Sequence, residues 1–563
     1  MPVTALRGRW SEARSSTVSE DDRSPVGSVA GPDRVAIYRA GRVHVADGTP
    51  RGDAMLVHAG VIAEVGPYER LLAQAGADAA TFDLRPYAVL PGMIDAHCHI
   101  AQLGYLAGAT NVGPDVAKEI SDIQDILSRA SPDESGWIVG RGYADYALVE
   151  RRSPTRDDLD HAVRDAPCVI YHASLHECVV NTSALRQLGL LDVWDDPPGG
   201  RYGRDQAGRL DGRAIEAPMF TLFAAAISER LQRDGRDLVA RATAHLASFG
   251  ITSCIDANTT AYEVRALADA ARADLLAIRV GSLCRFADLQ AIVSSDAFFG
   301  IPADTLRIVG AKVFADGGMT NRTAAVEPAY DRPAGEKGLL LMDERAIADA
   351  ARKSAEHGLG LGVHAQGERA IGAAVAALRS ADRAATTLRR IEHGGAFSPA
   401  LQRAAADADL TVVSQPAFIS VLGDGFIDAF GSRRARYLYP FRTLLGLGMD
   451  LAFSSDAPVV TPSPWVGARD AQLRLTAGGA AMNEQECLTA DEVLERYTRA
   501  AARSGAPAPD AGSLAAGRPA DFVVIDDPLL EPAEKWGELR VVATVVSNTV
   551  RFGDVRRPSG ARA

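Results

Sequence analysis

Several features are absent from this sequence, and each absence excludes a class of protein. The 563 residues include only six cysteines, without CxxC spacing, which argues against a disulfide framework and favours reduced thiols in a cytoplasmic protein. No run of about 18 uncharged apolar residues occurs, so we expect no membrane-spanning helix. The net charge of −12 is spread along the chain, which argues against nucleic acid or an anionic membrane as a partner.

The beginning of the chain lacks the apolar stretch of a signal peptide. It is rich in Ser, Arg, Asp and Gly, so we expect residues 1–33 to form a disordered leader. The whole chain is much longer than the usual domain of about 100–200 residues. Hydrophobic residues make up 47%, which is typical of a globular enzyme. We therefore expect one large catalytic domain with smaller appended or inserted parts.

Short strands with alternating polarity occur near both ends of the chain. At the N-terminal side they are expected at 35–38, 41–45, 54–58 and 61–65, and at the C-terminal side within 512–526 and at 541–547. Glycines between these strands indicate turns. We expect residues 34–86 and 508–555 to build one small β-sandwich domain from the two ends of the chain.

Between these ends, eight apolar, β-rich runs alternate with mostly helical segments. Eight parallel strands with intervening helices form a (β/α)8 barrel, so the predicted fold is α/β with a TIM-like barrel over residues 87–507. The long segment after the first run, about 101–215, is expected to be an inserted subdomain. The runs lie at 88–94, 251–256, 276–283, 307–316, 359–365, 388–393, 410–415 and 450–456.

A His-x-His pair follows the first run, and other metal-binding residues follow later ones. On a strand, His97 and His99 project to the same side and form half of a divalent-metal site. His364 and His393 end the fifth and sixth runs, and Asp456 ends the eighth. These positions coincide with the strand ends at which barrel active sites lie. Since the chain has only eleven histidines, this grouping predicts a metal centre.

A lysine, Lys312, lies inside the apolar fourth run. A buried lone ammonium is costly, and burial shifts the lysine pKa toward the neutral amine. A neutral amine can add carbon dioxide to give a carbamate, which is an anionic, carboxylate-like ligand. The alternative is that Lys312 pairs with an acid such as Asp316 or Asp256 and that a single metal ion binds.

These positions together resemble the amidohydrolase superfamily of metal-dependent hydrolases. The resemblance rests on residues 91–99, Lys312, His364, His393 and 455–458, and it covers about residues 34–550. The chain resembles in particular the branch that contains N-substituted formamide deformylases. Segments that carry this second resemblance are 137–143, 176–181, 312–317, 364–370, 391–393, 440–444, 455–458 and, more widely shared, 512–521.

The resemblance implies a carbamylated Lys312 that bridges two divalent metal ions. His97, His99 and Asp456 would hold the first ion, and His364 and His393 the second. Zn²⁺ is expected, one or two ions per chain, because imidazole and oxygen ligands suit it; Mn²⁺, Fe²⁺, Co²⁺ and Ni²⁺ are alternatives.

Three residues are candidates for contact with the substrate or with the reacting water. Asp456 is the carboxylate of the set and the expected proton shuttle. His176, in the insert, would reach the mouth of the barrel and hydrogen-bond the substrate; an ordinary core or surface histidine is the alternative. Arg322, in the loop after the fourth run, would hold an anionic group of the substrate, with a structural arginine as the alternative.

The predicted function is hydrolysis of a C–N bond in a small amide, formamide or cyclic amide by metal-activated hydroxide. A metal-dependent lyase or isomerase is a second hypothesis, because barrel sites are reused for other chemistry. A non-catalytic scaffold is a third, which the complete set of ligands argues against. A small-molecule substrate is the expected partner, neither nucleic acid nor membrane is expected, and a homodimer is left open.

Overall fold

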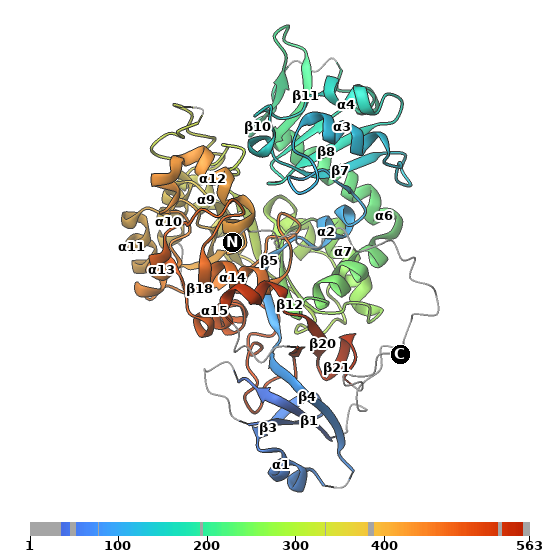
Figure 1. Ribbon diagram of the computed structural model, residues 1–563, viewed down its shortest axis with the longest axis vertical. Coiled ribbons are helices and arrows are strands. Elements are labelled where there is room, and N and C mark those ends of the chain that lie inside the picture. Colours follow the sequence, from blue (N-terminus) through green and yellow to red (C-terminus); the bar gives the residue numbers. More distant parts are fainter. Residues whose placement is uncertain are drawn as a thin grey trace, which may run out of the picture.

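The computed structural model of the chain describes residues 35–45, 52–76, 78–191, 195–332, 334–380, 388–526 and 532–555. Their strands form three sheets of seven, eight and six strands. Figure 1 shows the eight-stranded sheet in the middle, the sheet of the chain ends below it and the sheet of the insert above it. The predicted leader, residues 1–33, lies outside the described residues.

The eight-stranded sheet is the predicted barrel. All printed pairs between its neighbouring strands are parallel, and the order runs from β18 through β17 to β12 and then β5. The strands are β5 (Met93–Cys98), β12 (Ile251–Thr259), β13 (Arg279–Arg285), β14 (Leu306–Phe314), β15 (Gly360–Ala365), β16 (Arg389–His393), β17 (Thr411–Ser414) and β18 (Leu451–Phe453). The predicted (β/α)8 fold is therefore confirmed.

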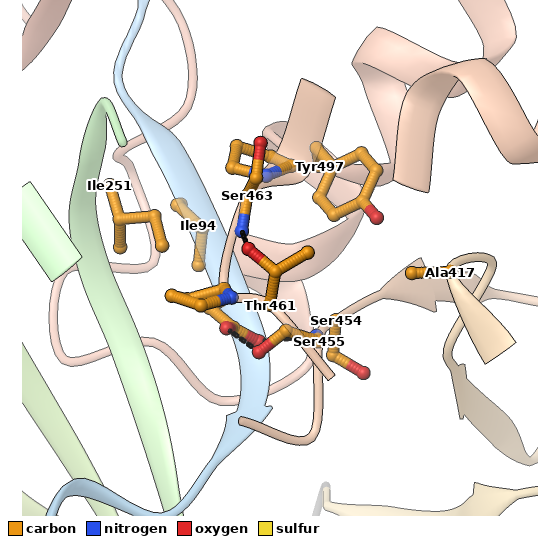
Figure 2. A pocket seen from close by; sticks show the side chains of 11 residues that line it. Ile94, Ile251, Ala417, Ser454, Ser455, Thr461, Ser463 and Tyr497 are labelled. Carbon is orange, nitrogen blue, oxygen red and sulfur yellow. Dashed lines mark hydrogen bonds between the residues drawn. The ribbon is translucent and has the colours of Figure 1, made fainter. Parts of the chain in front are cut away.

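The seam between β18 and β5 is closed by hydrogen bonds at the C-terminal ends of the two strands. The backbone N–H of Asp456 donates to His97 O at 2.8 Å, and that of His99 donates to Ala457 O at 2.8 Å. Figure 2 shows a small pocket beside this seam, with Ile94 from β5 facing the segment that follows β18. The closure holds the chain segments of three predicted metal ligands against one another.

The first barrel strand differs from its predicted position. The apolar run 88–94 is divided between β4 (Ala80–Pro91), which belongs to the sheet of the chain ends, and β5, which belongs to the barrel. Gly92 separates them, and a Cβ atom there would overlap the side chain of Thr252. The last residues of β4, which belong to this run, are buried, and so is all of β5, so the apolar run carries no sign of the change of sheet.

Strands from both ends of the chain share the seven-stranded sheet. Its centre is the antiparallel pair of β4 and β19, with Leu90 opposite Val523. Val61 at one edge forms an isolated bridge with Pro519, so the sheet curls toward itself. The boundaries of a separate domain stay a prediction. In spatial order the strands are β21 (Thr549–Gly553), β20 (Val541–Val546), β19 (Phe522–Ile525), β4, β1 (Val35–Val43), β2 (Ala54–His58) and β3 (Val61–Gly66).

The insert has its own sheet and a separate small core. Its last strand ends at Glu216, where α6 (Ala217–Ala247) begins and packs against α2 (Ile100–Leu106), which follows His99. Both ends of the insert therefore leave from the side of the barrel that carries the predicted metal ligands. The strands are β6 (Thr110–Asn111), β7 (Ile138–Tyr143), β8 (Cys168–His172), β9 (Glu177–Val180), β10 (Gly200–Arg204) and β11 (Leu210–Glu216), accompanied by α3 (Ile120–Ser128), α4 (Arg156–Ala162) and α5 (Thr182–Gln187).

Helices surround the barrel and connect its strands. Within the described ranges, none of the helices is long and apolar enough to cross a membrane. Besides α1 (Tyr68–Ala75) in the sheet of the chain ends, the remaining helices are α7 (Ala261–Arg272), α8 (Leu289–Val293), α9 (Glu344–Ala355), α10 (Glu368–Ser380), α11 (Pro399–Asp407), α12 (Phe418–Ala435), α13 (Phe441–Gly446), α14 (Pro464–Leu473), α15 (Ala490–Arg496) and α16 (Arg499–Arg503).

Candidate metal centre and active site

His97 in β5 and His99 just after it have their Nδ1 atoms occupied and their Nε2 atoms directed at one carboxylate. His97 Nδ1 lies 2.6 Å from Glu392 Oε2, and His99 Nδ1 lies 2.7 Å from Ala257 O. The Nε2 atoms lie 3.3 Å (His97) and 3.0 Å (His99) from Asp456 Oδ1. A partner at Nδ1 fixes the ring and its tautomer, which is how proteins present Nε2 to a metal ion.

His393 and His364 face each other at the ends of the sixth and fifth strands, with ring centroids 4.5 Å apart. His393 Nδ1 lies 2.9 Å from Gln415 Oε1, whereas its buried Nε2 has no hydrogen-bond partner among the described residues. Burial lowers the pKa of His393 to about 3 and that of His364 well below its usual value. Both rings are therefore neutral at pH 7, and neutral imidazole is the form that binds metal.

A carboxylate completes the cluster. Ligand atoms of His97, His393 and Asp456 all lie within 4.8 Å of one another. Burial alone would raise the pKa of Asp456, but the charge and hydrogen bonds of His97 and His99 hold it well below its usual range. The neutral imidazoles of His364 and His393, the ionised carboxylate of Asp456 and the unpartnered Nε2 atom of His393 fit a divalent cation, because these groups have lone pairs that can bind one.

Lys312 lies beneath this cluster on β14 and has no ion-pair partner among the described residues. Its side chain is buried, its Nζ atom has no hydrogen bond, and Nζ lies over the ring of Phe314, 5.1 Å from the centroid. Burial lowers the pKa of Lys312 to about 8, although the charges of Glu392 and Asp456 oppose the shift. An appreciable fraction of the amine is therefore neutral near pH 7 to 8.

The acids expected as alternative partners of Lys312 are engaged elsewhere. Asp316 accepts hydrogen bonds from the backbone N–H groups of Ala325, Gln366 and Gly367. Asp256 accepts one from Ile100 N at 3.1 Å. Neither acid therefore forms the ion pair with Lys312 that the single-metal alternative required. The number of metal ions stays a prediction.

Glu392 and Gln415 support the histidines, and the sequence-based candidates did not include them. Glu392 is fully buried, and burial alone would raise its pKa; the guanidinium of Arg390, which donates to both carboxylate oxygens at 2.8 Å, and the hydrogen bond to His97 hold that pKa well below its usual range. The available signal is the pair Arg390-x-Glu392, whose side chains project to the same side of one buried strand, since paired buried charges require a reason. Gln415 offers no such signal.

Four residues of this region have left-handed backbone conformations that non-glycine residues seldom adopt. The φ angles are 72° at His393, 59° at Asp456, 58° at Glu216 and 59° at Arg322. Such conformations cost free energy and persist where the surrounding structure enforces them, which is common at functional sites. His393 and Asp456 are thus held in place by their backbone as well as by their hydrogen bonds.

His176 is the residue of the insert that reaches the cluster. It precedes β9, its ring centroid lies 5.3 Å from that of His364, and its Nδ1 atom lies 2.9 Å from Glu216 Oε2. The structure therefore brings His176 beside the barrel histidines, as expected for a residue at the mouth of the barrel. Its contact with a substrate stays a prediction.

Arg322 is held by two aspartates instead of facing free space. Its guanidinium donates to Asp145 Oδ2 at 2.8 Å and to Asp428 Oδ2 at 2.7 Å. Asp145 belongs to the insert and Asp428 to α12, so Arg322 connects these two parts. The two carboxylates offset its charge, and its predicted role toward an anionic substrate stays a prediction that these contacts do not favour.

The chain is similar to known proteins over most of its length. A model of the amidohydrolase family matches residues 80–552, which contain the barrel, the insert and most strands of the chain-end sheet. The chain belongs to the amidohydrolase family. This amidohydrolase is 27% identical over 514 residues to the N-substituted formamide deformylase of Arthrobacter pascens, with 89% of this chain and 94% of that relative covered.

A second relative of this amidohydrolase is the putative amidohydrolase YtcJ of Bacillus subtilis (strain 168). The two are 25% identical over 539 residues, which cover 92% of this chain and 99% of the relative. Among solved structures, an uncharacterized metal-dependent hydrolase from Pyrococcus horikoshii OT3 has a TM-score of 0.72 at 24% identity, covering 89% of this chain and 99% of that one. This likeness shows a shared fold.

Family membership confirms the resemblance predicted from the sequence. The protein is a metal-dependent hydrolase that acts on carbon–nitrogen bonds other than peptide bonds. Neither the family nor the site geometry favours the lyase or isomerase hypothesis. The identity of the metal, the carbamate and the roles of single residues stay predictions, as do the cytoplasmic location and the homodimer.

Proposed function

We propose that this amidohydrolase cleaves the C–N bond of an N-substituted formamide or a related small amide. The observation that carries the proposal is the cluster of His97, His393 and Asp456, whose ligand atoms lie within 4.8 Å of one another at the strand ends. The choice of a formamide is supported by the Arthrobacter pascens relative, whose name states that substrate class.

The metal centre of the proposal uses the residues that the barrel brings together. His97, His99 and Asp456 would hold one Zn²⁺ ion, and His364 and His393 a second. Lys312 Nζ would form a bond to the carbon of carbon dioxide and release a proton, which gives a carbamate able to bridge the two ions. A bound divalent cation supplies Lewis acidity and lowers the pKa of a water molecule toward about 7.

The protein's own residues would orient the reactants and move the proton. Asp456 directs Oδ1 at His97 and His99, and its Oδ2 lies 3.9 Å from His393 Nδ1. Oδ2 would take a proton from the attacking water and deliver it to the leaving nitrogen, which must be protonated to depart. The water oxygen bonds to the carbonyl carbon, the C–N bond breaks, and a carboxylic acid and an amine result.

The test is a screen of small amides with protein that has been stripped of metal and reconstituted with Zn²⁺. We expect turnover of N-substituted formamides only after reconstitution, with one oxygen of labelled water in the acid product. A lyase or isomerase would form products without that oxygen. Full activity in protein with verified metal depletion would contradict the proposal, as would products free of the label.

A further inference from the structure

A carboxylate of the insert, Glu216, holds His176 at the edge of the metal-ligand cluster. Glu216 Oε2 lies 2.9 Å and Oε1 3.2 Å from His176 Nδ1. The backbone N–H of Glu216 also donates to His176 O at 2.9 Å, so the two residues are joined through both main chain and side chain. Glu216 is fully buried, where an unpaired carboxylate would be costly.

The position of the Glu216 carboxylate is fixed from the other side by the loop after β14. The Thr323 hydroxyl donates to Glu216 Oε1. Its oxygen accepts a hydrogen bond from the backbone N–H of Gly318 at 2.9 Å. The side-chain amide of Asn321 also lies 3.5 Å from Oε1. Oε1 is thus surrounded by donors, which leaves Oε2 to accept the hydrogen on His176 Nδ1.

The backbone at Glu216 adds to this restraint. Its φ of 58° and ψ of −121° lie outside the regions that residues with a side chain prefer, at the junction where β11 ends and α6 begins. A glycine would adopt this conformation without strain. A glutamate in this strained conformation is expected where its carboxylate has a function.

Neighbouring residues pack against carbon atoms of the His176 ring, whereas its Nε2 atom has no hydrogen-bond partner among the described residues. Phe220 of α6 meets the ring edge-on with centroids 5.4 Å apart, and a Cβ atom on Gly318 would lie 3.2 Å from His176 Cδ2. No hydrogen bond to Nε2 is present within the described part of the chain, and the side chain is 11% exposed. The free nitrogen therefore lies on the side of the ring that Glu216 does not occupy.

We propose that Glu216 is a positioning residue, which keeps a hydrogen on His176 Nδ1 so that Nε2 binds the amide group of the substrate. The insert would thus contribute a substrate-binding nitrogen beside His364. This inference rests on the proposed hydrolysis of a small amide. It adds a residue of the insert to a site that is otherwise built from barrel strands.

The decisive variant is Glu216→Gln, which keeps the shape of the side chain. Thr323 and Asn321 donate to Oε1, so the carbonyl oxygen of the glutamine would occupy that place and its NH₂ group would face His176 Nδ1. Nδ1 would then have to accept, and the hydrogen of the neutral ring would move to Nε2. Loss of the correct histidine tautomer by a carboxylate-to-amide change is known to reduce catalysis strongly.

The kinetic test is a double-mutant cycle with His176→Phe, which keeps an aromatic ring against Phe220 but has no Nε2 atom. We expect each single variant to lower kcat/KM for an N-substituted formamide by about 10- to 100-fold, the usual worth of one such hydrogen bond. We expect the double variant to be no worse than His176→Phe alone, since Glu216 acts through His176. Additive losses would overturn the proposal.

A second readout does not depend on turnover. In protein labelled with ¹⁵N-histidine and loaded with Zn²⁺, the His176 signal, assigned by its absence in His176→Phe, should show a hydrogen on Nδ1 in the wild type and its loss from Nδ1 in Glu216→Gln. Adding the formamide should shift the Nε2 signal of the wild type. A hydrogen on Nε2 alone in the wild type, or an Nε2 signal that the formamide leaves unchanged, would overturn the proposal.

Two controls separate this inference from others. Glu356→Gln makes the same chemical change at an exposed residue after α9, and should leave kinetics and the His176 signal unchanged. Melting temperature and metal content are measured on every variant, so a folding defect is recognised. If the wild type binds the formamide at Nε2 but does not hydrolyse it, the proposed hydrolysis fails while the role of Glu216 stands.

Discussion

The two sides of the site are built in different ways. On the barrel side, His97 lies in β5, His393 ends β16 and Asp456 follows β18, so the parallel sheet fixes their spacing. Glu392 and Gln415, which contact His97 and His393, also lie in or directly after barrel strands. On the insert side, His176 and Glu216 come from a separate six-stranded sheet, and they reach the site through contacts between distant segments. The barrel side holds the proposed metal ligands, and we expect the chemistry to depend on it most.

This difference predicts a graded series of effects. Changes to groups beneath or within the barrel cluster should abolish catalysis, changes to groups that orient the ligands should weaken it, and a change to the ion pairs of Arg322 between insert and barrel should affect stability more than chemistry.

The largest effect is expected for Lys312→Ala. The variant removes the group proposed to carry the bridging carbamate, so activity should fall to background, and a short carboxylic acid supplied with Zn²⁺ should partly restore it. Lys353→Ala, on the exposed side of α9, serves as the matched control. An unmodified ammonium at Lys312 in a fully metallated crystal structure would refute the carbamate.

Asp456→Asn should come next. The amide keeps the shape and one oxygen of the carboxylate but cannot take up the proton, so we expect kcat to fall by about 100- to 10,000-fold. Metal content, determined on the same sample, should stay close to that of the wild type. Turnover at the wild-type rate with chemistry shown to be rate-limiting would remove Asp456 from this role.

Glu392→Gln should have a smaller effect, because Glu392 contacts the proposed ligand His97 and is not itself a proposed ligand. The change weakens the hydrogen bond that orients His97 and leaves Arg390 without its carboxylate. We expect metal affinity or activity to fall by about 10- to 100-fold. Competition with a chelator measures the metal affinity directly. If both affinity and activity are unchanged, Glu392 is not needed to orient His97 for metal binding.

The smallest effect on chemistry is expected for Arg322→Gln. The variant leaves Asp145 and Asp428 without their shared cation, and because Arg322 is partly exposed we expect a loss of about 1–2 kcal/mol in the free energy of unfolding. Hydrolysis of an uncharged formamide should change little. A loss of kcat/KM confined to anionic substrates would instead restore the substrate-binding role predicted from the sequence.

The sequence revealed the barrel side of the site because residue order alone positions it. His97, His99, His364, His393 and Asp456 end apolar runs, and the ends of parallel strands meet at one rim. The first strand was misplaced because an apolar run cannot show where one sheet passes into another at Gly92. The partners of Arg322 and the role of Glu216 depend on how the insert packs on the barrel, and no local pattern encodes that packing.

The most direct test of the barrel-side cluster is anomalous diffraction from crystals of the wild-type protein reconstituted with Zn²⁺. Peaks are predicted within about 2.0–2.2 Å of ligand atoms of His97, His99 and Asp456, and of His364 and His393 if a second ion binds. Crystals of active, Zn²⁺-reconstituted protein that show no peak at these residues, or a peak elsewhere in the fold, would contradict the assignment of the metal centre.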